Sequence, residues 1–440
     1  MSSLTAAFLS FPLLFVLILF RVPIGLAMFG LGLAGSIYVN GSATAVMSQL
    51  KTLPFDTYSN YSLAIIPMFL LMGHFASHGG LSRKLFKAAE AWLGHHRGGV
   101  AMSAVGACAG FGAICGSSLA TAATMAQVAL PELKRYGYSG TLATGCLAAG
   151  GTLGVLIPPS LVLVIYALLT EQNIAKLFMA AFIPGIMAAI GYIIAISIYV
   201  RLKPASAGVR EPAPARERVQ ALIDVWPVIA IFALVVGGIY FGIFSPSEGA
   251  AVGAAGTGLI ALLNGGLNRS NFMTSLLQTA TSSAMIFFIV LGASFFNAFL
   301  AFAQMPQAAA TWVTDQGFHP YTVLIAILIF YMILGCFMDS LSMILLTIPI
   351  FFPVITTLDF GMGAEDFALW FGILVLIVVE VGLITPPVGM NLFVINSMAG
   401  DTPILDTYRG ALPFILSDFV RVAVLIAFPS ITLCLVWFFG

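Results

Sequence analysis

Two short polar clusters inside long apolar stretches have the residue types needed to bind an ion. The first is Gly116-Ser117-Ser118, and the second is Met338-Asp339-Ser340. Hydroxyl and backbone carbonyl oxygens suit a hard monovalent cation such as sodium. Asp339 adds a carboxylate that could hold a cation or carry a proton. The first cluster has no carboxylate, which disfavours a divalent ion there.

Each cluster is followed along the chain by a stretch where a helix must break. Gly150 to Ser160 has the sequence GGTLGVLIPPS, and Gly382 to Pro387 has the sequence GLITPP. Glycines and a double proline interrupt a helix and leave backbone groups unpaired. Two broken membrane segments at corresponding places in two halves are the best sequence indication of a solute and ion site in a secondary transporter. The groups expected to face the two clusters belong to Gly151 to Ile157 in the first half and to Gly382, Thr385 and Asn391 in the second.

The chain repeats this arrangement in register. Ser118 corresponds to Ser340, and Gly154 and Pro158 correspond to Gly382 and Pro386, at nearly equal separations along the sequence. Each device alone has a simpler explanation, because serines beside small residues often lie at helix contacts and a Gly-Pro-Pro pattern can simply kink a helix. The occurrence of both devices twice favours a site.

The composition predicts an all-α polytopic membrane protein, because 60% of the 440 residues are hydrophobic and only 8% are charged. We expect about ten membrane-spanning helices. Two further apolar stretches, 99–131 and 321–355, carry polar residues at mid-length and are predicted to be re-entrant helical hairpins with tips inside the protein. The ten spans are predicted near 5–20, 24–39, 61–79, 140–169, 177–200, 226–243, 247–265, 276–302, 366–396 and 411–438.

The predicted organisation is two inverted halves, 1–200 and 226–440, joined by a cytoplasmic linker at 201–225 that is rich in Pro, Ala and Arg and expected to be flexible. The first half holds the first hairpin and the broken helix 140–169, and the second holds the other hairpin and the broken helix 366–396. Lys and Arg in short loops place the entry of the first hairpin on the cytoplasmic side and that of the second on the opposite side.

Other ionisable and reactive residues give weaker indications. Glu380 could be an ion ligand or a structural carboxylate, while Glu248, just after Ser245, is predicted to cap a helix. The five cysteines lack metal-ligand or disulfide spacing, and no nucleophile, base and metal set converges, so an enzyme is not expected. The segment Gly79 to Gly99 is predicted to form an amphipathic helix on the membrane surface, with Gln307 to Gln316 in the matching place of the second half.

Six longer motifs, in this order, resemble the large membrane subunit of tripartite ATP-independent periplasmic (TRAP) transporters, the DctM type. They are AIIPMFLLMGHFASHGGLSRKLF at Ala64 to Phe86, FGAICGSSLATAATM at Phe111 to Met125, GTLGVLIPPSLVLVIYALLT at Gly151 to Thr170, GGIYFGIFSPSEGAAVGA at Gly237 to Ala254, GCFMDSLSMILLTIPIFFPV at Gly335 to Val354 and VEVGLITPPVGMNLFVI at Val379 to Ile395. The resemblance covers nearly the whole chain.

This resemblance implies a multi-pass protein of the bacterial inner membrane that imports an organic acid with sodium by an elevator movement. It also implies a small four-span membrane subunit (DctQ type) and a periplasmic substrate-binding protein (DctP type) as partners. We expect contact with membrane lipid and none with nucleic acid. Carried over by position, one sodium site would involve Ser117, Ser118, Gly154, Ile157 and Pro158, and the other Asp339, Ser340, Gly382, Thr385 and Pro386.

The substrate would lie between the two hairpin tips, near Gly116, Ser117, Asp339 and Asn391. The sequence leaves a dicarboxylate, a sugar acid and a keto acid open. A free-standing sodium- or proton-coupled carboxylate transporter, which needs no binding protein, is the alternative that the repeat alone would allow. A channel is disfavoured because the polar residues cluster at two tips and form no continuous path.

Overall fold

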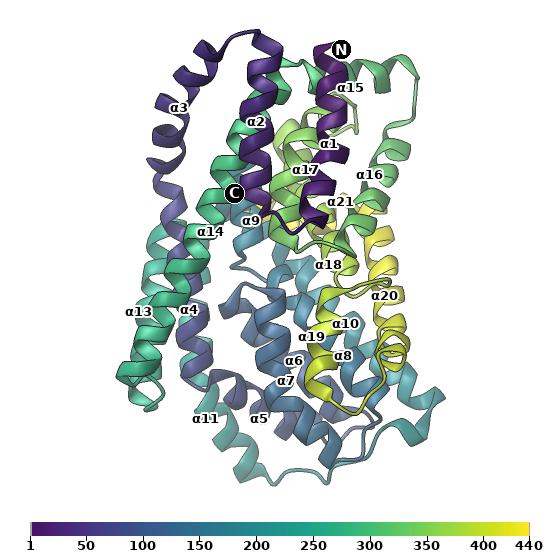
Figure 1. The fold of residues 1–440 in the computed structure, drawn as a ribbon. Coiled ribbons are helices and arrows are strands. Elements are labelled where there is room, and N and C mark those ends of the chain that lie inside the picture. Colours follow the sequence, from purple (N-terminus) through teal and green to yellow (C-terminus); the bar gives the residue numbers. More distant parts are fainter. Residues whose placement is uncertain (1, 440) are drawn as a thin grey trace.

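The computed structural model describes residues 2–439, which fold into helices joined by short turns, with no strand among them (Figure 1). This architecture follows from the apolar composition, since in a bilayer a helix satisfies its own backbone groups. The prediction of an all-α polytopic membrane protein is confirmed. Within 2–439, five helices are long and apolar enough to cross a membrane alone, and one bent helix pair would make a sixth by length and composition. The predicted number of spans therefore stays a prediction.

Two groups of helices form a frame along one side of the molecule. α2 packs along α14, and α13 packs along α4 (Figure 1). Small residues permit the close approach: a Cβ on Gly32 of α2 would lie 2.6 Å from the backbone carbonyl carbon of Phe295 in α14. The frame consists of α1 (Ser3–Leu19), α2 (Ile24–Asn40), α3 (Ala43–Tyr58), α4 (Ile65–His78), α11 (Ala215–Phe232), α12 (Gly238–Tyr240), α13 (Pro246–Leu263) and α14 (Arg269–Phe302).

The remaining long helices form a core bundle beside the frame. Its two hairpins are α6 (Gly99–Cys115) with α7 (Ser118–Arg135), and α16 (Pro320–Gly335) with α17 (Ser340–Ile355); its two broken helices are α8 (Gly140–Leu156) with α9 (Leu161–Thr170), and α18 (Ala364–Gly382) with α19 (Met390–Ala399). α8 and α9 are bent by 43° at their break. α10 (Ile174–Leu202), α20 (Ile404–Ala427) and α21 (Pro429–Phe439) complete the bundle.

The second part of each broken helix packs against the hairpin of the other half. α9, from the first half, packs against α17 of the second hairpin, and α19, from the second half, packs against α7 of the first hairpin. Each hairpin is therefore covered by helices of both halves. This arrangement brings the two tips and the two breaks into one region of the bundle, although they lie far apart in the sequence.

Short amphipathic helices connect the frame to each hairpin. α5 (Leu81–Leu93) precedes the first hairpin, and α15 (Met305–Asp315) precedes the second. α5 buries an apolar face that includes Leu81 and Phe86 and packs on α6 and α11. Both connectors lie within or close to the segments predicted from their helical periodicity.

The linker between the halves is mostly exposed, as expected of a solvated segment, and its flexibility stays a prediction. It is also anchored to the rest of the chain at a few points. Helices reach into both ends of 201–225, and the coil between them is bound to the core bundle, where the Ser139 amide donates to the Ser206 carbonyl at 2.9 Å. The Arg210 guanidinium pairs with Glu90 of α5 at 3.6 Å and with Glu217 of α11 at 2.8 Å. Burial raises the pKa of Glu90 despite this partner.

Local sequence signals account for several helix ends. Ser245 and Glu248 form a reciprocal capping box at the start of α13, as the sequence predicts. α3 is the main helix that the span prediction left out, because Gln49, Lys51 and Asp56 lower the apolar character of this segment. In Figure 1 it extends above α4 at the edge of the frame.

Candidate functional site

The first hairpin tip lies directly against the first helix break. Ser117 is the N-cap of α7, and Gly116 before it has a φ of 66°, a left-handed conformation that favours glycine. A Cβ on Gly154 would lie 2.9 Å from the Ser117 carbonyl oxygen, and one on Gly151 would lie 3.1 Å from that of Ser118. Only glycine lets the backbone of the break approach the tip oxygens this closely.

The first break is fully buried and lined by uncharged oxygens. Ile157 and Pro158 are buried in the gap between α8 and α9, and Ser160 caps the first turn of α9 by accepting from the Leu163 amide. Thr121 Oγ1 is buried beside Gly154 and has no hydrogen-bond partner among the described residues. The break therefore offers hydroxyl and backbone oxygens without a charge.

The second tip repeats the arrangement with a carboxylate added. Asp339 is the N-cap of α17, and its two oxygens accept from the Ser342 amide at 3.0 Å and from the Ser342 hydroxyl at 2.5 Å. The tip is tied to the break because the Gly389 amide donates to the Cys336 carbonyl at 3.2 Å. A capping carboxylate is oriented but keeps lone pairs free for a cation.

The second break packs on its hairpin through glycine, as the first does. A Cβ on Gly335 of α16 would lie 3.0 Å from the Gly382 Cα, and in the first half a Cβ on Gly112 of α6 would overlap with Gly154. Thr385 donates to the Val381 carbonyl at 2.6 Å and is half-buried. The second break differs in exposure, because Pro386 and the proline after it are exposed, whereas both prolines of the first break are buried.

Glu380 lies between the two tips. It is only 1% exposed, and its Oε1 accepts from the Ser340 hydroxyl at 2.5 Å. The side chain of Ser118, from the other tip, interacts with the same carboxyl group. Glu380 Oε2 has no hydrogen-bond partner within residues 2–439. The residue that the sequence left open between ligand and structural carboxylate is thus central to the site.

Asn391 joins the second half to the first at the same depth. Its Nδ2 donates to the Ala148 carbonyl of α8 at 3.3 Å, while its Oδ1 is buried and has no partner in the described part of the chain. Together with Thr121 Oγ1 and Glu380 Oε2, it gives three buried oxygens around the tips and breaks that lack a donor. Such oxygens fit a hard monovalent cation or a hydrogen-bonding substrate.

Sequence reasoning missed a buried polar network behind the first break. Thr152 of α8 contacts Tyr192 of α10 at 3.1 Å, and the Tyr192 hydroxyl donates to Asp418 of α20 at 2.7 Å. Asp418 in turn pairs with Arg421 at 2.8 Å, and both side chains are almost completely buried. The signal was available, because an acid and a base three residues apart inside a predicted span indicate a pair at membrane depth.

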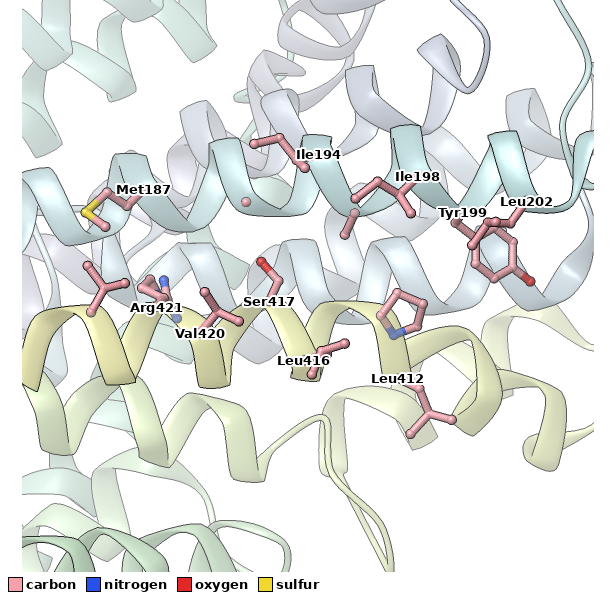
Figure 2. Close-up of a pocket in the computed structure, with 14 residues that line it drawn as sticks. Met187, Ile194, Ile198, Tyr199, Leu202, Leu412, Leu416, Ser417, Val420 and Arg421 are labelled. Carbon is pink, nitrogen blue, oxygen red and sulfur yellow. The ribbon is translucent and has the colours of Figure 1, made fainter.

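A large apolar groove lies elsewhere in the core bundle. It has a volume of about 730 Å³ and runs between α10 and α20, with Ile194 and Ile198 on one side and Leu416 and Val420 on the other (Figure 2). None of the predicted site residues lines it. Its apolar walls face outward from the bundle, so it is not the ion or solute site.

Comparison with known proteins gives a consistent result. Residues 11–431 match the model of the family described as tripartite ATP-independent periplasmic transporter, DctM component. The chain is 37% identical over 411 residues to the C4-dicarboxylate TRAP transporter large permease protein DctM of Pseudomonas aeruginosa, covering 92% of this chain and 93% of that protein. It is 29% identical to the sialic acid TRAP transporter large permease protein SiaM of Vibrio cholerae, with 94% of each chain covered.

Among solved structures, the fold is similar to that of the YdaH transporter of Alcanivorax borkumensis. The TM-score is 0.66 at 14% sequence identity, and the match covers 88% of this chain and 89% of that chain. This likeness concerns the fold alone.

Proposed function

Because the chain belongs to the family of DctM components of tripartite ATP-independent periplasmic transporters, we propose that it imports an organic acid together with sodium across the bacterial inner membrane. Its relatives are large permease subunits of transporters, and the chain is the same kind of subunit. The observation that supports sodium coupling best is the contact of each hairpin tip with a broken helix. Both contacts bring together backbone carbonyl and side-chain oxygens, the ligand type that a hard monovalent cation prefers.

The residues of the tips and breaks have defined tasks in this proposal. Backbone carbonyls around Gly154 and Ile157, with the hydroxyls of Ser117 and Ser118, would hold one sodium ion. Asp339, with the backbone around Gly382 and Thr385, would hold the other. Bound sodium supplies the positive charge that keeps the two tips ordered against the breaks.

The organic acid would bind between the tips. α7 and α17 both begin at the tips, with N-caps at Ser117 and Asp339, so the positive ends of two helix dipoles are directed at this region. Helix N-termini favour a carboxylate without requiring an arginine. Gly116 packs closely on the first break, since a Cβ there would lie 3.3 Å from the Pro159 carbonyl oxygen. The Asn391 amide oxygen has no partner among the described residues and could accept from a hydroxyl group of the substrate, though not from its carboxylate. The substrate is proposed only as a carboxylate, since relatives of this chain are named for different substrates.

We further propose that the core bundle moves against the frame as an elevator. The hairpins and broken helices pack on one another across both halves, whereas the frame helices pack mainly on each other. The short helices α5 and α15 connect the two bodies. A small membrane subunit and a periplasmic binding protein would complete the transporter, the first beside the frame and the second delivering the substrate.

The test is uptake of labelled organic acids into proteoliposomes that contain this chain and its small subunit, with and without an inward sodium gradient and the binding protein. We expect uptake that requires both. Uptake that needs sodium but no binding protein would identify a free-standing symporter. Uptake that is unaffected by sodium would contradict the proposed coupling.

A further inference from the structure

Glu380 interacts with a serine of each hairpin tip. Ser340 donates to its Oε1 at 2.5 Å, and Ser118 interacts with the same carboxyl group from the opposite hairpin. Oε2 forms no hydrogen bond with a described residue. Ser340 therefore holds one oxygen of the carboxyl group, and Ser118 acts on the same group from the other tip.

No basic side chain among the described residues forms an ion pair with the Glu380 carboxyl group. The charged groups that act on it are Asp418 and Arg421 of α20, and these pair with each other at 2.8 Å. Nor is it held by backbone amides, as a capping carboxylate would be. A buried carboxyl group with so few partners is costly, and its position is explained by the two serines that it faces.

We propose that Glu380 is a positioning residue that makes the two ion sites order together, an inference that rests on the sodium-coupled function proposed above. An ion that orders one tip fixes its serine relative to Glu380. The carboxyl group then holds the serine of the other tip, so that the second site forms more readily. Reciprocity requires the same factor in both directions, and couplings of this kind change affinity roughly 5- to 150-fold.

The repeat supplies a matched comparison for this role. Thr152 occupies the place in α8 that Glu380 occupies in α18, two residues before the glycine of the break. The Thr152 hydroxyl contacts Tyr192 and the Ala149 carbonyl, and forms no hydrogen bond to either tip. The connection between the tips therefore depends on the second half alone.

The chain carries a natural reporter at each tip. Cys115 ends α6 at the first tip, and Cys336 follows α16 at the second; they are 6% and 4% exposed, so a thiol reagent reaches either one only when its tip opens. In a variant that keeps Cys115 as its single cysteine, we would measure the sodium concentration that half-protects this thiol from a maleimide. Choline replaces sodium to hold the ionic strength constant.

The second site is then weakened by Asp339→Asn. With Glu380 present, this change should raise the sodium concentration that protects Cys115 roughly fivefold or more. In Glu380→Leu the shift should disappear, while Glu380→Gln, which keeps an acceptor for Ser340, and the control Thr152→Val should both retain it. A merely structural role for Glu380 would lower stability without removing this dependence.

A shift of the same size in Glu380→Leu would overturn the inference. Glu380→Ala repeats the measurement if the leucine variant is not monodisperse. If sodium protects neither cysteine in the otherwise unchanged chain, the sodium-coupled function itself fails, which is a distinct result. In the converse experiment, with Cys336 as the reporter and Ser117→Ala at the first site, a shift should again appear with Glu380 present and disappear in Glu380→Leu.

Discussion

The two halves of this protein contain the same backbone arrangement but differ in the charged side chains around it. In both, a hairpin tip meets a broken helix through a glycine contact, at Gly154 in the first half and at Gly382 in the second. Yet every fully buried charged side chain among residues 2–439, namely Glu380, Asp418 and Arg421, belongs to the second half. The first break offers only uncharged oxygens and is buried, whereas the prolines of the second are exposed. The backbone repeat thus fixes the geometry, and the charges distinguish the two sites.

The largest loss of stability should come from breaking the buried ion pair that only the second half contains. Arg421→Met leaves Asp418 charged and unpaired in the bundle, which typically costs about 3–5 kcal/mol of stability. The free energy of unfolding of the purified protein in mixed micelles would measure this loss. The double variant Asp418→Asn with Arg421→Met should recover most of it, because no lone charge remains. An Arg421→Met variant as stable as the unchanged chain would contradict the assignment.

The second largest effect should be a loss of transport activity when a side chain fills either glycine contact. We expect it in both halves because each has a hairpin that packs on a break through glycine. Gly154→Ala would place a Cβ 2.9 Å from the Ser117 carbonyl, and Gly382→Ala would place one 2.6 Å from the Gly335 Cα. Overpacking of this kind costs about 1–3 kcal/mol and would displace the tip. We expect sodium-dependent uptake to fall close to background in both variants.

The control for these two variants is Gly30→Ala, a helical glycine with open space around its Cβ position. It should transport like the unchanged chain. If only one of the two glycine variants lost uptake, the two tips would not be equivalent in mechanism, and the repeat would be a feature of the fold alone.

Removing a single ligand oxygen from either tip should change the sodium dependence of uptake by a smaller amount, and the change should differ between the two tips. Asp339→Asn removes a charged ligand, and hydrogen-bonding or ionic contacts to charged groups are worth about 1.5–3 kcal/mol, against about 0.5–1.5 kcal/mol for neutral ones. The sodium concentration for half-maximal uptake should therefore rise roughly tenfold or more in Asp339→Asn and less in Ser117→Ala. Ser397→Ala, at an exposed position of α19, serves as the control. Equal shifts at the two tips would remove the distinction between a charged and a neutral site.

The sequence predicts the positions of the two helix breaks well, but it predicts poorly which helices and side chains contact them. Pro158, Pro386 and the glycines before them mark the breaks, because these residue types disturb a helix wherever they occur. The role of Glu380 could not be read from its position, since its contact with Ser340 spans two helices and its approach to Ser118 spans the two halves. The exchange of α9 and α19 between the halves likewise depends on packing that no local pattern encodes.

Two charge pairs were also missed in the sequence, and only the first of them had a local signal. Asp418 and Arg421 stand three residues apart within the predicted span 411–438, and their opposite charges indicate a buried pair. The linker carries Arg210, whose partner Glu90 lies on the amphipathic helix α5, so this pair could be predicted only with knowledge of how α5 is placed. Charge identity is visible in sequence, whereas the partner of a charge usually is not.

The smallest effect concerns the ion pairs that join the halves at the two ends of the core bundle. Lys134, at the end of α7, pairs with Asp401 after α19 at 2.8 Å, and Lys176, in α10, pairs with Glu365 in the first turn of α18 at 2.9 Å. The hydrogen bond from Lys134 lowers the pKa of Asp401. A lowered carboxyl pKa stabilises the folded protein above the unfolded-state pKa, and this contribution is lost as the pH falls through the folded-state pKa.

Asp401→Asn should therefore melt slightly below the unchanged chain near neutral pH, and the difference should disappear as the pH falls through the lowered folded-state pKa of Asp401, where its carboxylate takes up a proton. Thermal unfolding midpoints measured across this range would test the prediction. Glu365→Gln, which breaks the pair at the other end, is the matched control for a general loss of surface charge. Because both side chains of the Lys134–Asp401 pair are largely exposed, high salt should weaken the effect. A difference that persisted unchanged at low pH would show that Asp401 acts through the packing of the α19–α20 turn instead of through its charge.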